Sequence, residues 1–422
     1  MVVADVVWFQ ADSCPHQESP RGEGVGVKNV LLVILLVIVS RTLGIPQATT
    51  AQPPETAATA IHESDAAAHR IDGAVIYDHD PETNPGDDVF GNVICDFELD
   101  APGRNSHGGP VCMEYPDGSL VAFHTNTSDH NLDGWSEYAV SKDRGKTWKK
   151  YQKFAHCFEA YRKTPQRSAW VQEGLVTDKG TGVVFVSHWE NNKRVRVVFM
   201  RSHDNGSTWS DAQPVDGDFI GAPAAVAVSG GTNYVLFDCD GARGRHVLYA
   251  STDDGTSWQK RSTLPLEIPA WYGALCIMED GSLLAGAYIT ADEDHLHYCI
   301  SHDGGRSWTT QKRTRLDKKI RDPELAFIGG KYYLHGRSGH KGKGANRFVM
   351  YHSDDGVKWK SGLIVSAEHG GYDGYSHNCV INKYDPDTPN ELMIEYSIRY
   401  KGRDTNTYVF FVRPQQSRII PE

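Results

Sequence analysis

The sequence predicts an all-β protein, a β-propeller of six blades, and three observations support this. A turn motif with Ser or His, Asp, Gly and Trp in that order occurs five times, at Ser141–Trp148, Ser202–Trp209, Ser251–Trp258, Ser301–Trp308 and His352–Trp359. After one longer first interval, the tryptophans recur about every fifty residues, a period typical of propeller blades. Upstream of each motif, a glycine-containing turn separates two β-type runs.

The chemistry of the motif assigns it to a fixed place in each blade. We expect the Asp to accept backbone N–H bonds inside a tight turn and the Gly to supply a positive φ angle. The Trp ring should pack against the neighbouring hairpin. Each motif should therefore connect the third and fourth strands of its blade. In the fifth copy, the sequence assigns the Asp position to Asp354 and the first position to His352.

Five blades are expected to begin near His107, Trp170, Ala222, Trp271 and Arg321. A sixth blade without the motif begins near Tyr375. Its last strand, Tyr408–Val412, should share a blade with the early segment Ala74–Tyr77, which would close the ring and remove exposed sheet edges. Residues 78–106 have room for further strands, so five or seven blades are the alternatives.

The N-terminal part predicts targeting and a linker. In residues 1–51, Lys28 precedes the apolar run Val30–Val39, and small residues follow around Ala48–Ala51, the order of a secretory signal. A signal-anchor is the alternative, although the run is short for a membrane span. Residues 52–73, rich in Ala, Thr, Pro and Glu, predict a flexible linker before a propeller over residues 74–422. We therefore expect a secreted or periplasmic protein.

Charge and cysteines exclude some classes of function. The net charge of −11, with no block of Lys or Arg, disfavours a nucleic-acid groove. Of the eight cysteines, seven follow the signal, so at least one is unpaired. Cys276 and Cys299 lie in one predicted blade and could pair, with buried free thiols as the alternative. The spacing lacks a CxxC pattern, so we expect no zinc site and no cofactor.

Polar and aromatic residues recur where first strands begin and second strands end, which is where propellers usually bind ligands. These residues are His107, His124 and Asp129 in the first blade, Arg167, Trp170 and His188 in the second, Tyr272 in the fourth, Arg321, Glu324, Arg337 and Arg347 in the fifth, and Tyr375, His377 and Glu395 in the sixth. Such a set suits a glycan, because aromatic rings stack on sugars while the other side chains bond hydroxyls or pair with a carboxylate. Each residue taken singly could instead be a hydrogen-bonded turn or rim residue.

The repeated motif resembles the Asp-box, or bacterial neuraminidase repeat, of the sialidase superfamily, over roughly residues 74–415. In that family the boxes are structural turns remote from the catalytic face, so the resemblance implies the fold more than a reaction. The family's active site uses three arginines on the substrate carboxylate, a Tyr nucleophile assisted by Glu, and an Asp acid.

The match to that active site is partial. Gly374-Tyr375-Ser376 resembles the nucleophile segment, and Arg347 matches the family's later arginine. Gly108 stands where the first arginine is expected, and the expected Glu and Arg of the fourth blade are missing. Glu395 or Glu324 would assist Tyr375, and Asp129 would be the acid. Arg167, Arg321 and Arg337 could rebuild an anion site.

Three functions follow as hypotheses. The first is a sialidase-like glycoside hydrolase that cleaves a terminal, acidic sugar through Tyr375. The second is a polysaccharide lyase, in which His107 or His124 removes the proton beside a uronate carboxylate, Arg167 neutralises that carboxylate, and Tyr272 or Tyr375 protonates the leaving oxygen. The third is a glycan-binding propeller without catalysis.

Replacing His107 separates the last two hypotheses. His107→Ala should abolish turnover in a lyase, whereas a binding module should lose little more than affinity. Product formation and binding, measured on the same glycan, give the two results.

Overall fold

The structure of the protein is a computed structural model. It describes residues 69–80, 82–87, 89–95, 106, 110–127, 134–149, 151–163, 167–191, 193–216, 221–239, 245–266, 270–339, 347–366, 375–399 and 405–415. The chain divides into two compact units, residues 1–61 and 62–422, and every described residue belongs to the second. The predicted signal segment lies outside the described residues.

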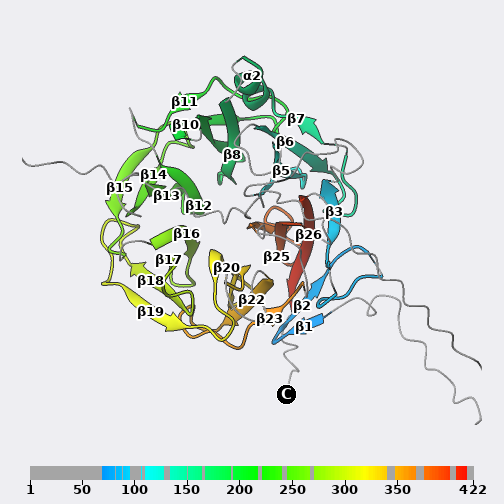
Figure 1. Cartoon of the computed structure of the whole chain (residues 1–422), viewed down its shortest axis with the longest axis vertical. Helices are drawn as coiled ribbons and strands as arrows, with labels where there is room; N and C mark the ends of the chain where they lie inside the picture. The colour runs from blue at the N-terminus through cyan, green and yellow to red at the C-terminus, as the bar shows by residue number, and fades with distance from the viewer. Residues whose placement is uncertain are drawn as a thin grey trace, which may run out of the picture. The chain divides into compact units, whose positions relative to one another are not determined.

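Six blades form a ring (Figure 1). Blade I contains β4 (Val111–Glu114), β5 (Leu120–Thr127), β6 (Gly134–Ser141) and β7 (Gln152–Lys153) and is followed by helix α2 (Ala155–Lys163). Blade II contains β8 (Arg167–Val176), β9 (Gly182–Glu190), β10 (Lys193–Ser202) and β11 (Gln213–Pro214). Blade III contains β12 (Ala222–Ser229), β13 (Thr232–Cys239), β14 (Arg245–Ser251) and β15 (Gln259–Thr263).

The second half of the ring repeats this order. Blade IV contains β16 (Ala270–Ile277), β17 (Leu283–Ile289), β18 (His295–Ser301) and β19 (Lys312–Arg315). Blade V contains β20 (Arg321–Ile328), β21 (Lys331–Arg337), β22 (Phe348–Ser353) and β23 (Leu363–Ile364). Blade VI combines β24 (Ser376–Ile381), β25 (Glu391–Arg399) and β26 (Thr405–Pro414) with β1 (His69–Ile71), β2 (Ala74–Tyr77) and β3 (Asn92–Cys95).

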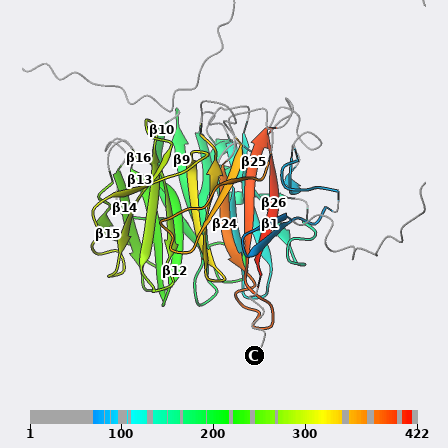
Figure 2. The same ribbon diagram turned by 90° about the horizontal axis from the view of Figure 1, so that it is seen from below.

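The first strands of the blades line the centre of the ring. Each contacts the next, from β4 through β8, β12, β16, β20 and β24 and back to β4. The side view shows the strands running between the two faces of the ring (Figure 2). Each described blade runs from its inner strand outward, so corresponding ends of the inner strands lie on the same face.

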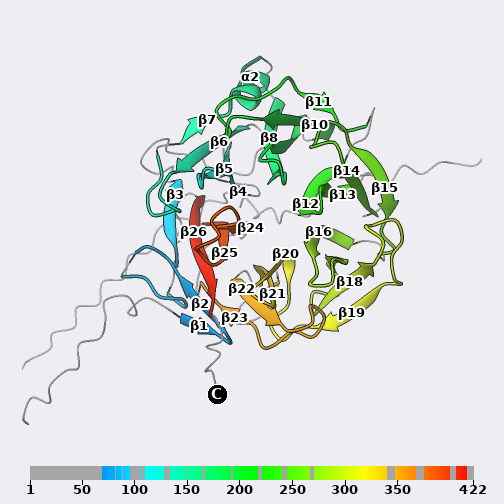
Figure 3. The same cartoon turned by 180° about the vertical axis from the view of Figure 1, so that it is seen from behind.

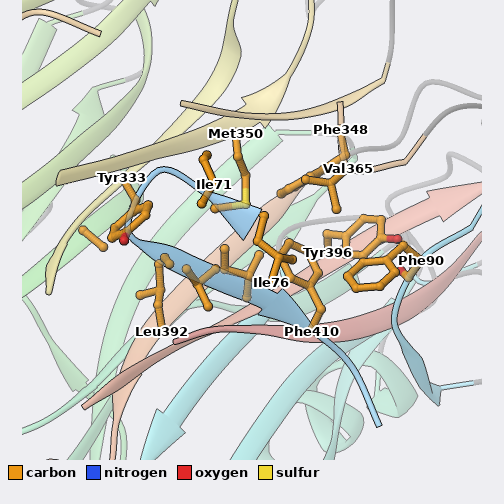
Figure 4. Close-up of a cluster of buried hydrophobic side chains, with 14 of the residues drawn as sticks. Ile71, Ile76, Phe90, Tyr333, Phe348, Met350, Val365, Leu392, Tyr396 and Phe410 are labelled. Carbon is orange, nitrogen blue, oxygen red and sulfur yellow. Dashed lines mark hydrogen bonds between the residues drawn. The ribbon is translucent and has the colours of Figure 1, made fainter. Parts of the chain in front are cut away.

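Apolar packing holds neighbouring blades together. Within the described chain, one buried hydrophobic cluster lies at each of the six interfaces between blades. Between blades V and VI, Tyr333 and Phe348 pack with Leu392, Tyr396 and Phe410 (Figure 4). Burial of large aromatic and aliphatic side chains is the main stabilising contribution in such an interface.

The ring closes as the sequence predicts. Strand β2 pairs antiparallel with β26, with Ala74 opposite Pro414 and Tyr77 opposite Phe411 (Figure 3). Strand β1 pairs with β2, from His69 opposite Ile76 to Ile71 opposite Ala74. The sequence assigns residues 69–71 to the linker, and this assignment is wrong because they form an edge strand of blade VI.

The first four turn motifs adopt the predicted hydrogen bonding. In blade I, Ser141 Oγ donates to Asp143 Oδ1 (2.8 Å) and accepts from the Gly145 N–H (2.8 Å), and Asp143 Oδ1 accepts from the Thr147 N–H (2.9 Å). The same bonds recur in blades II, III and IV. Gly145 has φ +81°, and a Cβ atom there would lie 2.5 Å from the Phe411 ring of blade VI.

The fifth motif is one residue shorter than the other four and begins at Ser353 instead of the predicted His352. Ser353 Oγ donates to Asp355 Oδ1 (3.0 Å), which also accepts from the Lys358 N–H (2.7 Å). The assignment of His352 and Asp354 to the motif is therefore wrong. Asp354 instead forms an ion pair with Lys331 at the surface.

Cys276 and Cys299 are both free and buried, so their predicted pairing is wrong and the free-thiol alternative is confirmed. Within the described residues, no helix has the length and apolar character needed to cross a membrane.

The corrected fifth motif predicts a difference between two adjacent aspartates. Asp355→Ala should lower the free energy of unfolding by roughly 1 kcal/mol, because it removes acceptors of turn hydrogen bonds. Asp354→Ala should change it little, because an exposed ion pair contributes weakly. Urea denaturation of both variants measures the difference. An equal effect of the two substitutions would contradict the corrected register.

Candidate functional site

Bulges at the beginning of the inner strands re-aim side chains toward one end of the ring. The strand register shifts between Val171 and Glu173 in β8, Pro223 and Ala225 in β12, Trp271 and Gly273 in β16, and Arg321 and Glu324 in β20. At two of these bulges, Tyr272 and Asp322 have φ angles of +44° and +49°. Residues other than glycine adopt this region at an energetic cost, and such strain and bulges are common at functional sites.

Three tyrosines from blades IV and VI meet at this end. The hydroxyl of Tyr272 lies 3.4 Å from the hydroxyl of Tyr375, which precedes β24. The ring of Tyr272 also stacks on that of Tyr288 in β17, with centroids 6.1 Å apart and an interplanar angle of 12°. Tyr375 of blade VI therefore joins two tyrosines of blade IV in one aromatic group.

Two buried arginines from blade V complete this group. Arg337 donates from Nε to Asp322 Oδ2 (2.6 Å), and its Cζ lies 5.0 Å from the centre of the Tyr375 ring. Arg321 donates from Nε and an Nη to the hydroxyl of Tyr288 (3.2 and 3.0 Å) and lies 3.5 Å from a carboxylate oxygen of Glu293. We call Tyr272, Tyr288, Glu293, Arg321, Asp322, Arg337 and Tyr375 the tyrosine–arginine cluster.

Burial and the charges of the cluster set the protonation of Arg337 and Tyr272. Burial lowers the pKa of Arg337, but the charges of Asp322 and of the phenolic oxygens of Tyr375 and Tyr272 raise it by more. The net effect is a raised pKa, so the guanidinium stays charged. The negative charge of an ionised Tyr375 and burial raise the pKa of Tyr272 well above its usual range. Because the Arg337 guanidinium lies against the ring of Tyr375, this tyrosine is the candidate nucleophile, with Tyr272 as its neutral hydrogen-bond partner.

A second buried group joins the inner strands β4, β8 and β24. His377 Nε2 lies 2.9 Å from Glu173 Oε2, and the Cys112 N–H donates to His377 Nδ1 (3.3 Å). Because Nδ1 accepts, the ring proton is on Nε2, which donates to Glu173. His377 therefore holds Glu173 in place, which is a structural role.

Glu324 has the electrostatics of a proton donor. Burial raises the pKa of its carboxyl well above the usual range, and the negative charges of Glu173 and Asp322 raise it further. A carboxyl group that stays protonated at neutral pH can donate a proton to a leaving group. Glu324 lies at the bulge that also positions Asp322.

Several predicted site residues do not join the tyrosine–arginine cluster. Glu395 is fully buried, and neither carboxyl oxygen has a hydrogen-bond partner among the described residues, so the expected support of Tyr375 by Glu395 is not found. His124 is 1% exposed, and burial lowers its pKa to about 3. Its Nε2 lies 4.0 Å from Glu137 Oε2. This buried position inside blade I argues against the predicted role of His124 as a catalytic base or acid.

The predicted residues of blade II form a separate group. Trp170 is buried against Trp189, with ring centroids 6.0 Å apart, and therefore contributes to packing. Arg167 is exposed and pairs with Glu190 (2.8 Å), and His188 contacts His156 of α2.

Arg347 of blade V is half-buried beside the end of β21, where its N–H donates to Ser338 Oγ (3.1 Å). His107 and Asp129 lie outside the described residues.

The sequence identified five of the residues in or beside this site, Tyr272, Arg321, Glu324, Arg337 and Tyr375, but missed others. In β8, regular alternation from Trp170 predicts that Gln172 points to the same side of the sheet. The bulge between Val171 and Glu173 reverses the alternation, so Glu173 instead contacts His377. Asp322 lies in the polar run Arg321-Asp322-Pro323-Glu324 that the sequence places at the mouth of blade five, whereas Tyr288 carried no signal of its own. Across the described chain, no three His, Cys, Asp or Glu side chains converge as metal ligands would.

The six blades and their repeated turn motifs define a β-propeller built from BNR-type repeats. The model of the BNR repeat-like domain family matches residues 96–237 and 220–369. These matches cover more than half of the chain, and the chain belongs to this family. No curated protein sequence matches the chain.

Solved structures show the same fold at low identity. A Dyadobacter fermentans protein of unknown function is 13% identical, with 76% of this chain and 97% of that chain covered and a TM-score of 0.61. The Hadza microbial sialidase Hz136 is 17% identical, with 77% and 68% covered and a TM-score of 0.60. A mutant of the NanB sialidase from Streptococcus pneumoniae is 11% identical, with 78% and 71% covered and a TM-score of 0.56. At these identities the likeness is one of fold.

The ion pair of Arg337 and Asp322 predicts a large effect when one partner is removed. Arg337→Gln should lower the free energy of unfolding by roughly 3 kcal/mol, because it leaves a buried carboxylate without its cation. The double variant Arg337→Gln/Asp322→Asn should recover part of this loss. Chemical denaturation measures both variants, and Arg313→Gln, at an exposed pair, is the control. No recovery in the double variant would contradict the pairing.

The buried Glu395 predicts a pH dependence of stability. Burial, followed by the charge of Cys379, raises the pKa of its carboxyl well above the ordinary value of 4.5. Because its folded pKa exceeds its unfolded pKa, its stabilising contribution is complete below pH 4.5 and is lost as the pH rises through the folded pKa. Glu395→Gln cannot ionise, so its Tm should fall less than that of the wild type as the pH rises. Parallel Tm curves for the two proteins would contradict this prediction, and Glu159→Gln on α2 is the exposed control.

Proposed function

We propose that the protein is a carbohydrate-active enzyme, a sialidase-like glycoside hydrolase that cleaves a terminal, acidic sugar from a glycan. The observation that carries this proposal is the position of Tyr375, with its hydroxyl 3.4 Å from that of Tyr272 and its ring 5.0 Å from the Arg337 guanidinium. The family and the sialidase fold of the similar structures support a function on glycans. We also propose that the protein is secreted or periplasmic.

In this proposal the chemistry proceeds in two steps. Tyr375 loses its phenolic proton to solvent as its oxygen attacks the anomeric carbon, the glycosidic C–O bond breaks, and the leaving oxygen takes a proton from an acid. Glu324, whose carboxyl pKa is raised by burial, is the candidate acid within the described part of the chain, and Asp129 is the candidate from the sequence. Water then attacks the anomeric carbon and gives one proton to the deprotonated acid, and the departing Tyr375 oxygen regains its proton from solvent, as in retaining hydrolases.

Arg321 and Arg337 would supply the positive charge for an acidic sugar. Both guanidinium groups are already neutralised in part by Glu293 and Asp322. A substrate carboxylate would therefore bind either by sharing these guanidinium groups with the protein carboxylates or by displacing the protein carboxylates from them. Arg347, near the end of β21, is the third candidate. This arrangement differs from a clamp of three arginines, because the first arginine position holds Gly108.

The test is mass spectrometry of glycan products formed in ¹⁸O-labelled water, with sialylated and uronate-containing glycans as substrates. Hydrolysis adds one labelled oxygen to the released sugar. Tyr375→Phe should lower kcat by roughly 100-fold or more, as expected for loss of the reacting hydroxyl. Tyr333→Phe is the matched control, because the Tyr333 hydroxyl has no hydrogen-bond partner in the described chain.

Two outcomes would replace the proposal. Unsaturated products without labelled oxygen would establish elimination, the lyase hypothesis, and would direct attention to His107. Binding of a glycan without any product would establish a binding propeller. In either case no labelled oxygen would be incorporated by the wild type, so Tyr375→Phe could not lower a rate of hydrolysis.

A further inference from the structure

A histidine pair lies outside the tyrosine–arginine cluster, at the junction of blades I and II. His156 is in the first turn of α2 and His188 is near the end of β9, and their Nε2 atoms are 3.1 Å apart. The rings meet edge to face, with centroids 5.1 Å apart. Both views down the ring place α2 on its outer side, beside β8 (Figures 1 and 3).

The two histidines are neutral at physiological pH. Burial, followed by the charges of His156, Arg196 and Arg167, lowers the pKa of His188 to about 3. Burial, Arg196 and Lys163 lower the pKa of His156. Because the Nε2 atoms face each other at hydrogen-bonding distance, one ring donates and the other accepts. The pair therefore adds hydrogen-bonding groups without adding charge.

Two arginines extend this pair toward the solvent. Arg196 lies opposite His188 in the β9–β10 ladder, so both side chains project from the same side of the hairpin. Arg167 lies opposite Glu190 in the β8–β9 ladder and forms an ion pair with it. Arg196 is exposed and has no ion pair among the described residues.

The charge of this group is opposite to that of the whole protein. Arg167, Arg196 and Lys163 carry three positive charges against the one negative charge of Glu190, whereas the chain has a net charge of −11. A local excess of positive charge on an acidic protein attracts anions to that place. Guanidinium groups bind carboxylates and sulfates through paired hydrogen bonds.

The group lies on the same face of the ring as the tyrosine–arginine cluster. His188 and Glu190 are at the end of the second strand of blade II, and Arg167 is at the beginning of its first strand. Tyr272, Arg321 and Asp322 are at the beginning of the first strands of blades IV and V. The blades share one strand order, so these positions correspond.

We propose that His156, His188, Arg167 and Arg196 form a second, non-catalytic subsite that binds an anionic group of a glycan chain, a carboxylate or a sulfate. The link to a terminal sugar held at the tyrosine–arginine cluster rests on the proposed function, whereas anion binding at this subsite does not. The guanidinium groups pair with the anion, and the hydrogen-bonded histidine pair lies beside them. The subsite would select charged chains over neutral ones.

Calorimetry on the full chain at low ionic strength tests the subsite without requiring turnover. The probes are a uronic-acid tetrasaccharide, a sulfated tetrasaccharide and its unsulfated neutral parent. Arg196→Gln should weaken binding of at least one anionic probe about tenfold, as expected for loss of one charge-assisted hydrogen bond. Arg201→Gln, at the other end of β10, is the matched control and should leave the affinity unchanged. Equal Tm values show that both variants are folded.

Each result decides the proposal. The anionic probe that loses affinity identifies the group bound, carboxylate or sulfate. Equal binding of the neutral probe, or an unchanged affinity in Arg196→Gln and in Arg167→Gln, would overturn the subsite. If hydrolysis is established, Arg196→Gln should raise KM for the anionic oligosaccharide about tenfold and leave kcat/KM for a small aryl glycoside unchanged. If hydrolysis is absent, the calorimetric result still stands by itself.

Discussion

Closure of the ring by β2 against β26 is the constraint on which the rest of the structure depends. The pairing joins residues near the two ends of the propeller, and Arg413 of β26 reinforces it by donating to the hydroxyl of Tyr77 in β2 (2.9 Å). The closed ring brings His377 of blade VI to Glu173 of blade II, while Tyr375 of the same blade meets Tyr272 of blade IV across blade V. The candidate site is therefore a property of the whole ring, since no single blade contains it.

Local signals explain why most of the fold could be predicted from the sequence. Turn motifs and glycine turns depend on a few neighbouring residues, so the blade order followed directly, and strand alternation indicated the closing pair. The fifth motif was misaligned because Ser353-Asp354-Asp355-Gly356 offers two aspartates to one turn, and only the hydrogen bonds choose between them. Strand β1 was missed because three residues carry too little pattern.

The site was predictable only in part, because bulges break the alternation from which side-chain direction is inferred. Tyr272 and Asp322 adopt positive φ angles, and the phase shift in β8 exchanges Gln172 for Glu173. Partner choice was also hidden, since Tyr375 meets Tyr272 and Arg337 and not the expected Glu395. The charges of the site, two buried arginines facing two carboxylates, follow from these tertiary contacts.

Trapping the covalent intermediate tests the central claim most directly. The protein would be incubated with a fluorinated, activated glycoside of an acidic sugar, and its peptides would be analysed by mass spectrometry. The account predicts one glycosyl adduct, on the peptide containing Tyr375, and its absence in Tyr375→Phe. An adduct on another residue, or turnover of the reagent to an unsaturated product, would contradict a tyrosine nucleophile at this site.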